Sequence, residues 1–236
     1  MDRSDVPASV GTRDWVGRTM PLSGIAAVAL QAVAYPMTGS FDYRPSPERA
    51  AEIIGSNSSG IALAALLGGF YSILFLLVFV GVVAGAIRDV EGRGSLAFVA
   101  LAGGIVAALA LGFGYRFLAA AAHVADGPAG IGPEAAALAH RLFQMSFAGF
   151  VSVGLAAWIG ATGITAIRTG LLPGWLGWAS LAIAVGLMTP LHGPLEGIAL
   201  VWIVVASVLL YRRASLDHDL QGEPARRVEP RVGAAR

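Results

Sequence analysis

The chain has 236 residues, of which 56% are hydrophobic and only 13% are charged, and its net charge is +1. Soluble domains carry about twice this share of charged side chains, so too little polar surface remains to coat a water-soluble particle. The small net charge gives no general attraction to nucleic acid. The absence of Cys excludes disulfides and thiolate chemistry, and the absence of Lys excludes a Walker A phosphate loop and a Schiff-base lysine.

Six apolar runs follow one another along the chain, and a helix needs roughly 20 such residues to cross a membrane. We expect spans at about 19–37, 60–87, 96–115, 142–167, 171–188 and 196–211. The sequence therefore predicts an all-α, polytopic integral membrane helix bundle of six transmembrane helices within residues 19–213. Residues 1–18 are expected to form a cytoplasmic lead-in, and residues 214–236 a disordered cytoplasmic tail.

The arginines predict the orientation of the bundle. Six spans place twelve of the 16 arginines on the side that holds both termini. The remaining four, Arg44, Arg49, Arg116 and Arg141, fall on the other side. Because cytoplasmic loops carry an excess of Arg and Lys, both termini are predicted to lie in the cytoplasm. The richness in Arg, Ala, Gly and Val is typical of bacterial coding, so we expect a bacterial inner membrane.

The segments between the spans also carry local signals. In the first outer loop, residues 38–59, Ser46 followed by Pro47 is typical of a helix start, which predicts a short interfacial helix. A tight inner loop is expected at 88–93. The second outer segment, residues 117–140, is interrupted by Gly-Pro pairs at 127–128 and 132–133.

Small residues recur at four-residue spacing in the second, third and fourth spans, where they allow helix backbones to approach closely. We therefore expect these three spans to form the tight centre of the bundle. The rows are Ala64, Gly68 and Ser72 with Gly81 and Gly85, then Gly104, Ala108 and Gly112, then Ala148, Ser152, Ala156 and Gly160. Among the polar residues near a span end, Gln144 is the one that we expect to face a cavity.

Outer-face histidines and carboxylates suggest one possible chemical site. His123, Asp126, Glu134 and His140 come from the second outer segment, and His192 and Glu196 from the last outer turn. If His123, His140, His192 and Glu196 converge, they would supply zinc ligands and a general base. The spacing is not diagnostic, because Gly193-Pro194 interrupts any HExxH-like helix face.

The LLPGWLGW stretch at 171–178 resembles a group of uncharacterised bacterial polytopic membrane proteins classed as domains of unknown function. In that group a Leu-Pro-basic-Trp-Leu-Gly turn opens the penultimate helix, and the last helix runs into paired Arg. Here the turn reads Leu172-Pro173-Gly174-Trp175-Leu176-Gly177, and Arg212-Arg213 follow the last span. Gly174 stands in place of the basic residue. The resemblance implies the bundle fold and its topology, and no activity.

These observations leave three hypotheses for function open. The leading one is a non-catalytic membrane component that binds a lipid, a small hydrophobic molecule, or a membrane-protein partner, a second copy included. The second is a membrane-embedded metal-dependent enzyme that uses the outer-face residues. The third is an uncoupled transporter of a neutral solute, since the sequence places no ionisable Asp, Glu, Arg or His well inside a span, where ion-coupled carriers keep such groups.

Overall fold

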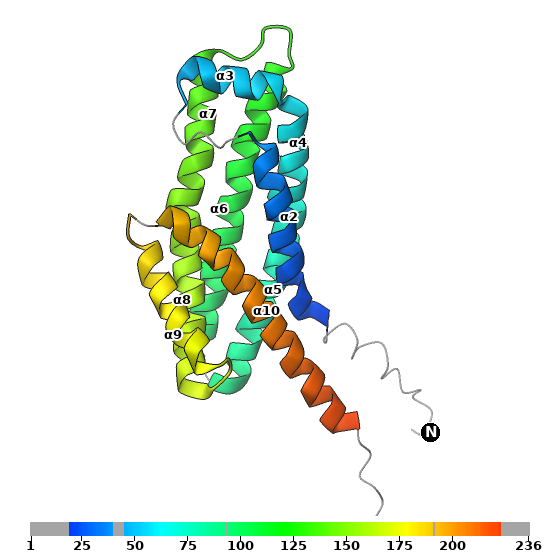
Figure 1. Ribbon diagram of the computed structural model, residues 1–236, viewed down its shortest axis with the longest axis vertical. Helices are drawn as coiled ribbons and strands as arrows, with labels where there is room; N and C mark the ends of the chain where they lie inside the picture. Colours follow the sequence, from blue (N-terminus) through cyan, green and yellow to red (C-terminus); the bar gives the residue numbers. More distant parts are fainter. Residues whose placement is uncertain (1–18, 40–44, 93, 191, 223–236) are drawn as a thin grey trace, which may run out of the picture.

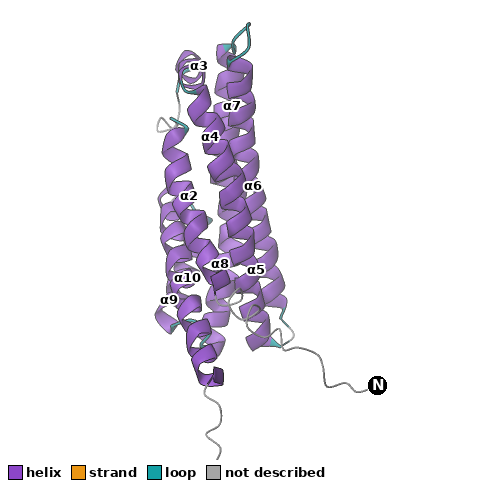
Figure 2. Ribbon diagram, turned by 90° about the vertical axis from the view of Figure 1, so that its right-hand side faces the viewer, coloured by secondary structure: helices purple, strands orange, loops and turns teal. Residues whose placement is uncertain are grey.

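The computed structural model describes residues 19–39, 45–92, 94–190 and 192–222, and every regular element in these ranges is a helix. Five helical stretches are long and apolar enough to cross a membrane: Met20–Met37, Ser58–Glu91, Ser95–Ala125, Pro133–Thr169 and His192–Leu216. They run along an elongated bundle (Figure 1; Figure 2). The predicted lead-in at 1–18, Arg44, Arg93 and residues 223–236 lie outside the described ranges.

Two of the long helices contain a π-helical segment. The elements in chain order are η1 (Met20–Leu22), α2 (Ser23–Met37), α3 (Pro47–Ser56), α4 (Ser58–Leu66), the π segment η2 (Leu67–Tyr71), α5 (Ser72–Glu91), α6 (Ser95–Ala125), α7 (Pro133–Met145), the π segment η3 (Ser146–Val151), α8 (Ser152–Thr169), α9 (Gly174–Leu187) and α10 (His192–Gly222). Single π turns inside α-helices occur frequently at functional sites.

The fifth predicted span, 171–188, is the short helix α9. Its 14 residues extend about 21 Å at 1.5 Å per residue, against about 30 Å for the hydrocarbon core of a bilayer. The turn between α9 and α10 therefore lies partway along the bundle, while α6 and α7 continue to its far end (Figure 1). Five of the six predicted spans have the expected length in the described part of the chain.

Three helix boundaries differ most from the prediction. α6 continues to Ala125, ten residues past the predicted end of its span, because an Ala-rich run favours helix and Leu118, Ala121 and Ala122 are buried in the bundle. α7 begins at Pro133, so the predicted second outer segment is reduced to a short loop. α10 continues to Gly222, beyond the predicted start of the tail at 214.

The short helix predicted in the first outer loop is confirmed as α3, which lies across one end of the bundle (Figure 1). The Ser46 side chain accepts a hydrogen bond from the Arg49 backbone amide at 3.3 Å, which satisfies one of the free N–H groups at the helix start. α3 buries Ala50 and Ile54, while an Arg49–Glu52 ion pair of 2.7 Å stays exposed on the outer face.

The second, third and fourth spans form the centre of the bundle, as predicted, with α6 packed against both α5 and α8. A close backbone approach between α6 and α8 lies at Gly103 and Gly154, which belong to none of the predicted rows. A Cβ built on Gly154 would lie 2.5 Å from the Ala107 amide nitrogen and 2.6 Å from the Gly103 carbonyl oxygen. The predicted role of Gly81 and Gly85 is wrong, because both are exposed and a Cβ on either would meet nothing within 4 Å.

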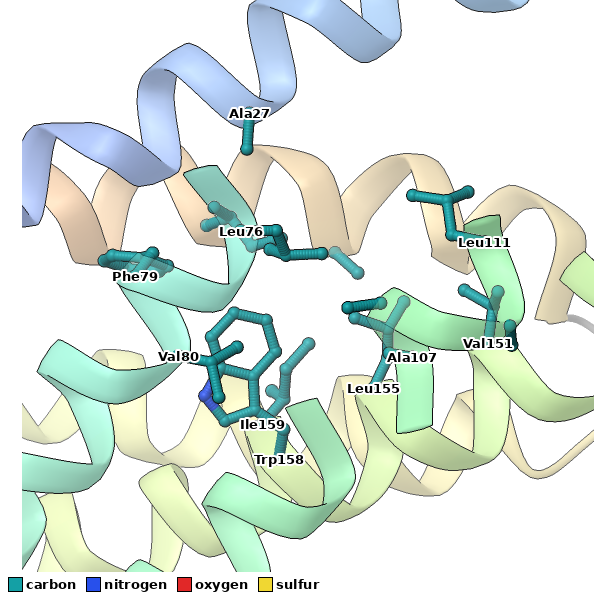
Figure 3. Packing of buried hydrophobic residues seen from close by; sticks show 14 of the residues in the cluster. Ala27, Leu76, Phe79, Val80, Ala107, Leu111, Val151, Leu155, Trp158 and Ile159 are labelled. Carbon is teal, nitrogen blue, oxygen red and sulfur yellow. The ribbon is translucent and has the colours of Figure 1, made fainter. Parts of the chain in front are cut away.

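Large side chains fill the bundle beside this close contact. Trp158 is fully buried, and its ring meets Phe79 edge-to-face at a centroid distance of 5.7 Å (Figure 3). Trp202 of α10 packs against Trp158 at 5.8 Å. The indole N–H of Trp202 donates to the Ser180 hydroxyl of α9 at 2.7 Å. This bond ties the α9–α10 hairpin together.

Replacing Trp202 by Phe is expected to lower the free energy of unfolding by about 1–2 kcal/mol, because the Ser180 hydroxyl loses a buried partner. Thermal unfolding in detergent measures the change. Trp175→Phe is the matched control, since Trp175 is 62% exposed and its replacement should leave stability within about 0.5 kcal/mol. Equal melting temperatures of the Trp202→Phe and Trp175→Phe variants would contradict a stabilising role for the Trp202–Ser180 hydrogen bond.

A candidate ligand cavity between α2, α8 and α10

A cavity of about 520 Å³ lies among α2, α5, α6, η3, α8 and α10. Its wall is mostly apolar, and Figure 3 shows six of the contributing side chains: Ala27, Leu76, Ala107, Leu111, Val151 and Leu155. Cavities of roughly 300–1,000 Å³ with apolar walls and a few polar groups are the usual binding sites for small molecules.

The course of α10 creates this space. α10 packs against α2 and η1, crosses the lower part of α2, and diverges from it toward the α9–α10 turn (Figure 1). Gly193 and Gly197 line the cavity in this diverging part, and a Cβ on either would meet nothing within 4 Å. Both are exposed in the isolated chain, so the cavity opens to the side of the bundle.

The polar end of the cavity is built around Glu196. Its Oε1 accepts a hydrogen bond from the Ser152 hydroxyl at 2.7 Å, across 44 residues of sequence. The same hydroxyl lies 3.2 Å from the Phe147 carbonyl oxygen in η3. Because a hydroxyl carries a single proton, it donates to one of these acceptors at a time, and Glu196 is the nearer. His192, one turn earlier on α10, also lines the cavity, with Nδ1 3.3 Å from the Thr189 carbonyl oxygen.

A second hydrogen-bond network contains the cavity-lining residues Gln31 and Ser72. Gln31 Nε2 donates to the Gly68 carbonyl oxygen in η2 at 3.0 Å, and the Tyr115 hydroxyl donates to Gln31 Oε1 at 2.9 Å. Ser72 donates to the Ala27 carbonyl oxygen at 2.9 Å. A Cβ on Gly68 would lie 2.6 Å from the Tyr115 ring, so glycine is needed where the ring crosses the π segment. These bonds join α2 to η2, α5 and α6.

Aromatic rings border the cavity near η3. Tyr35 and Phe147 line it, with their rings edge-to-face at a centroid distance of 6.0 Å. Phe143 packs on Phe147 at 5.0 Å and on Tyr115 at 5.5 Å. The rings therefore form a continuous group that joins the cavity wall to the buried Gln31 network.

The four residues of the predicted metal site lie in three different places. His192 and Glu196 line the cavity, and His140 is buried in α7, where it lines a second pocket of about 430 Å³. His123 is exposed near the end of α6. No three His, Cys, Asp or Glu side chains gather to hold a metal ion in the described part of the chain. The metal-dependent enzyme stays a prediction that this geometry does not support.

The sequence predicted the position of one polar cavity residue correctly and that of another incorrectly. Gln144 faces a cavity, as predicted: it lines both pockets, and its Nε2 is buried without an acceptor among the described residues. Glu196, by contrast, was expected in an outer turn, and it lies within the apolar helix α10. The signal that could have placed it there is the apolar run on its C-terminal side, which begins directly at Gly197.

Comparison with known proteins adds no further assignment. No protein-family model matches the chain, and no curated protein or solved structure is detectably similar to it.

Proposed function

We propose that the protein lies in the bacterial cytoplasmic membrane with both termini in the cytoplasm, that the four helical stretches before α9 cross it, and that α9–α10 form a short final hairpin that enters and leaves on the cytoplasmic side. Five long apolar helices support the membrane assignment. Arg88 and Arg168 lie in the last turns of α5 and α8, where the positive-inside rule puts the cytoplasmic side. With these ends at the inner boundary, the start of α10 lies about 21 Å into a hydrocarbon core of about 30 Å.

The function that we propose is non-catalytic binding of a small hydrophobic molecule in the cavity between α2, α8 and α10. The observation that carries this proposal is the cavity of about 520 Å³ with apolar walls and one polar end at Glu196. Its lateral opening lies at bilayer depth in the proposed topology, so a lipid-soluble ligand enters from the membrane. A molecule with an apolar body and a single polar head matches this distribution of groups.

The test fills the cavity at Gly197. A photoreactive decanol with a diazirine in its chain serves as the probe, applied to the full chain in phosphatidylcholine nanodiscs, and labelled peptides are located by mass spectrometry. Wild type is expected to be labelled at cavity residues of α2, α8 and α10. Gly197→Phe should lose most of this labelling, because the ring occupies open space along the cavity wall.

Gly81→Phe is the matched control, since it adds the same ring to an exposed glycine of α5 outside the cavity. It should retain the labelling of wild type. Labelling spread evenly over the lipid-facing residues of wild type, or equal labelling of the Gly197→Phe and Gly81→Phe variants, would overturn the proposed binding function.

A further inference from the structure

The charge balance of the cavity indicates the kind of polar head that it accepts. Of the described residues that line it, Glu196 is the only one with a formal charge, and Arg and Lys are absent among them. Within the described residues no basic side chain forms an ion pair with Glu196. The groups that face it are the Ser152 hydroxyl and, on its own helix, His192.

A carboxylate removed from water is stabilised by a cation or by several hydrogen bonds. Here the protein supplies Glu196 with one hydrogen bond, from Ser152 to Oε1. The imidazole of His192 is directed toward the preceding turn, with Nδ1 near the Thr189 carbonyl oxygen. The Gln31 amide is occupied on both sides, by Gly68 and Tyr115. Ser152 is the only hydrogen-bond donor for Glu196 among the described residues, so its other lone pairs are open to a ligand, although the unpaired amide of Gln144 lines the same cavity.

The aromatic wall favours the same chemistry. The rings of Tyr35 and Phe147 line the cavity together with Glu196. The face of an aromatic ring attracts a cation, and the attraction is stronger where water is excluded. One carboxylate and two rings around an apolar space suit a protonated amine on a hydrocarbon body.

Building on the proposed binding function, we propose that the cavity selects a cationic amphiphile whose protonated amine pairs with Glu196. The amine donates hydrogen bonds to the carboxylate, and its charge lies beside the Tyr35 and Phe147 rings. The hydrocarbon body packs on the apolar wall formed by Leu76, Leu111, Val151, Leu155, Leu200 and Ile203.

The experiment compares two competitors that differ only in the head group, decylamine and decanol, against the photoreactive decanol probe in phosphatidylcholine nanodiscs. In wild type, decylamine should displace the probe at a concentration about tenfold lower than decanol, because a charge-assisted hydrogen bond is formed only by the amine. Glu196→Gln keeps an oxygen for Ser152 and should bring the two competitors to equal potency. The ratio within each variant cancels differences in partitioning into the lipid.

Phe147→Leu is a second variant that keeps the carboxylate and removes one ring. It should reduce the preference for the amine by about threefold. Equal potency of the two competitors in wild type, or an amine preference that survives Glu196→Gln, would overturn the assignment of an amine ligand. Either outcome leaves the proposed binding function standing if cavity labelling remains sensitive to Gly197→Phe, so the two failures are distinguishable.

Discussion

The Gly154→Leu variant is expected to lose roughly 3 kcal/mol of its free energy of unfolding, at the upper end of the range for overpacked sites. A Cβ at this position would lie 2.5 Å from the Ala107 amide nitrogen and 2.6 Å from the Gly103 carbonyl oxygen. Both atoms belong to the backbone of α6 and cannot rotate away, so the two helices must separate. In a membrane such close backbone approach is a main source of helix association. Thermal unfolding in detergent measures the loss.

Gly85→Leu is the matched control for Gly154→Leu. It introduces the same side chain on α5, where a Cβ would meet nothing within 4 Å, and stability should change by less than about 0.5 kcal/mol. Gly103→Leu acts on the same contact, since its Cβ would lie 2.7 Å from the Gly154 carbonyl oxygen. The Gly103→Leu/Gly154→Leu double variant should therefore lose less than the sum of the single losses. A Gly154→Leu protein that melts like the control would contradict this account of the α6–α8 contact.

Replacing Gln31 by Leu is expected to cost about 2 kcal/mol of stability. The change leaves the Gly68 carbonyl oxygen and the Tyr115 hydroxyl without their partner, and each buried orphaned group costs about 1–3 kcal/mol. The lower part of that range applies because double-mutant cycles give an average of about 0.6 kcal/mol for a hydrogen bond between membrane helices. The same thermal assay in detergent gives the value.

A double-mutant cycle with Tyr115→Phe isolates the Gln31–Tyr115 bond. Tyr115→Phe alone should cost about 1 kcal/mol, and the combined variant should cost less than the two single changes added together. Tyr71→Phe removes the same hydroxyl from a side chain that is 41% exposed and serves as the control, with no expected change. Strict additivity of Gln31→Leu and Tyr115→Phe would show that the two side chains do not share a bond that stabilises the bundle.

Local physics explains which features could be predicted from the sequence. Ser46 and Pro47 mark the start of α3 because capping depends on a few neighbouring residues. The Gly-Pro pairs around residues 127–133 end one helix and start the next for the same reason. Hydropathy, averaged over windows of the chain, identifies the helices that are long and apolar enough to cross a membrane.

The faces of these helices could not be assigned in the same way. Lipid tails are as apolar as Leu, so no contrast between polar and apolar residues marks the side of a membrane helix that meets another helix. Gly81 and Gly85 satisfy the same four-residue pattern as true contact residues and are nevertheless exposed. Gly103 and Gly154 lie at a close contact between α6 and α8, and only the relative rotation of the two helices shows this.

By itself, the sequence determined that the protein is helical and apolar, and that it is built from apolar helices joined by short polar segments. These properties follow from composition, from hydropathy and from capping residues, all of which can be read without knowing any long-range contact. Only the tertiary structure decided where the side chain of Glu196 lies, in the cavity and against Ser152. Beside Gly193-Pro194 a charged residue is typical of an exposed turn, and its partial burial depends on Ser152, 44 residues earlier. The cavity, its aromatic wall and its single carboxylate arise from five separate parts of the chain, which folding alone brings together.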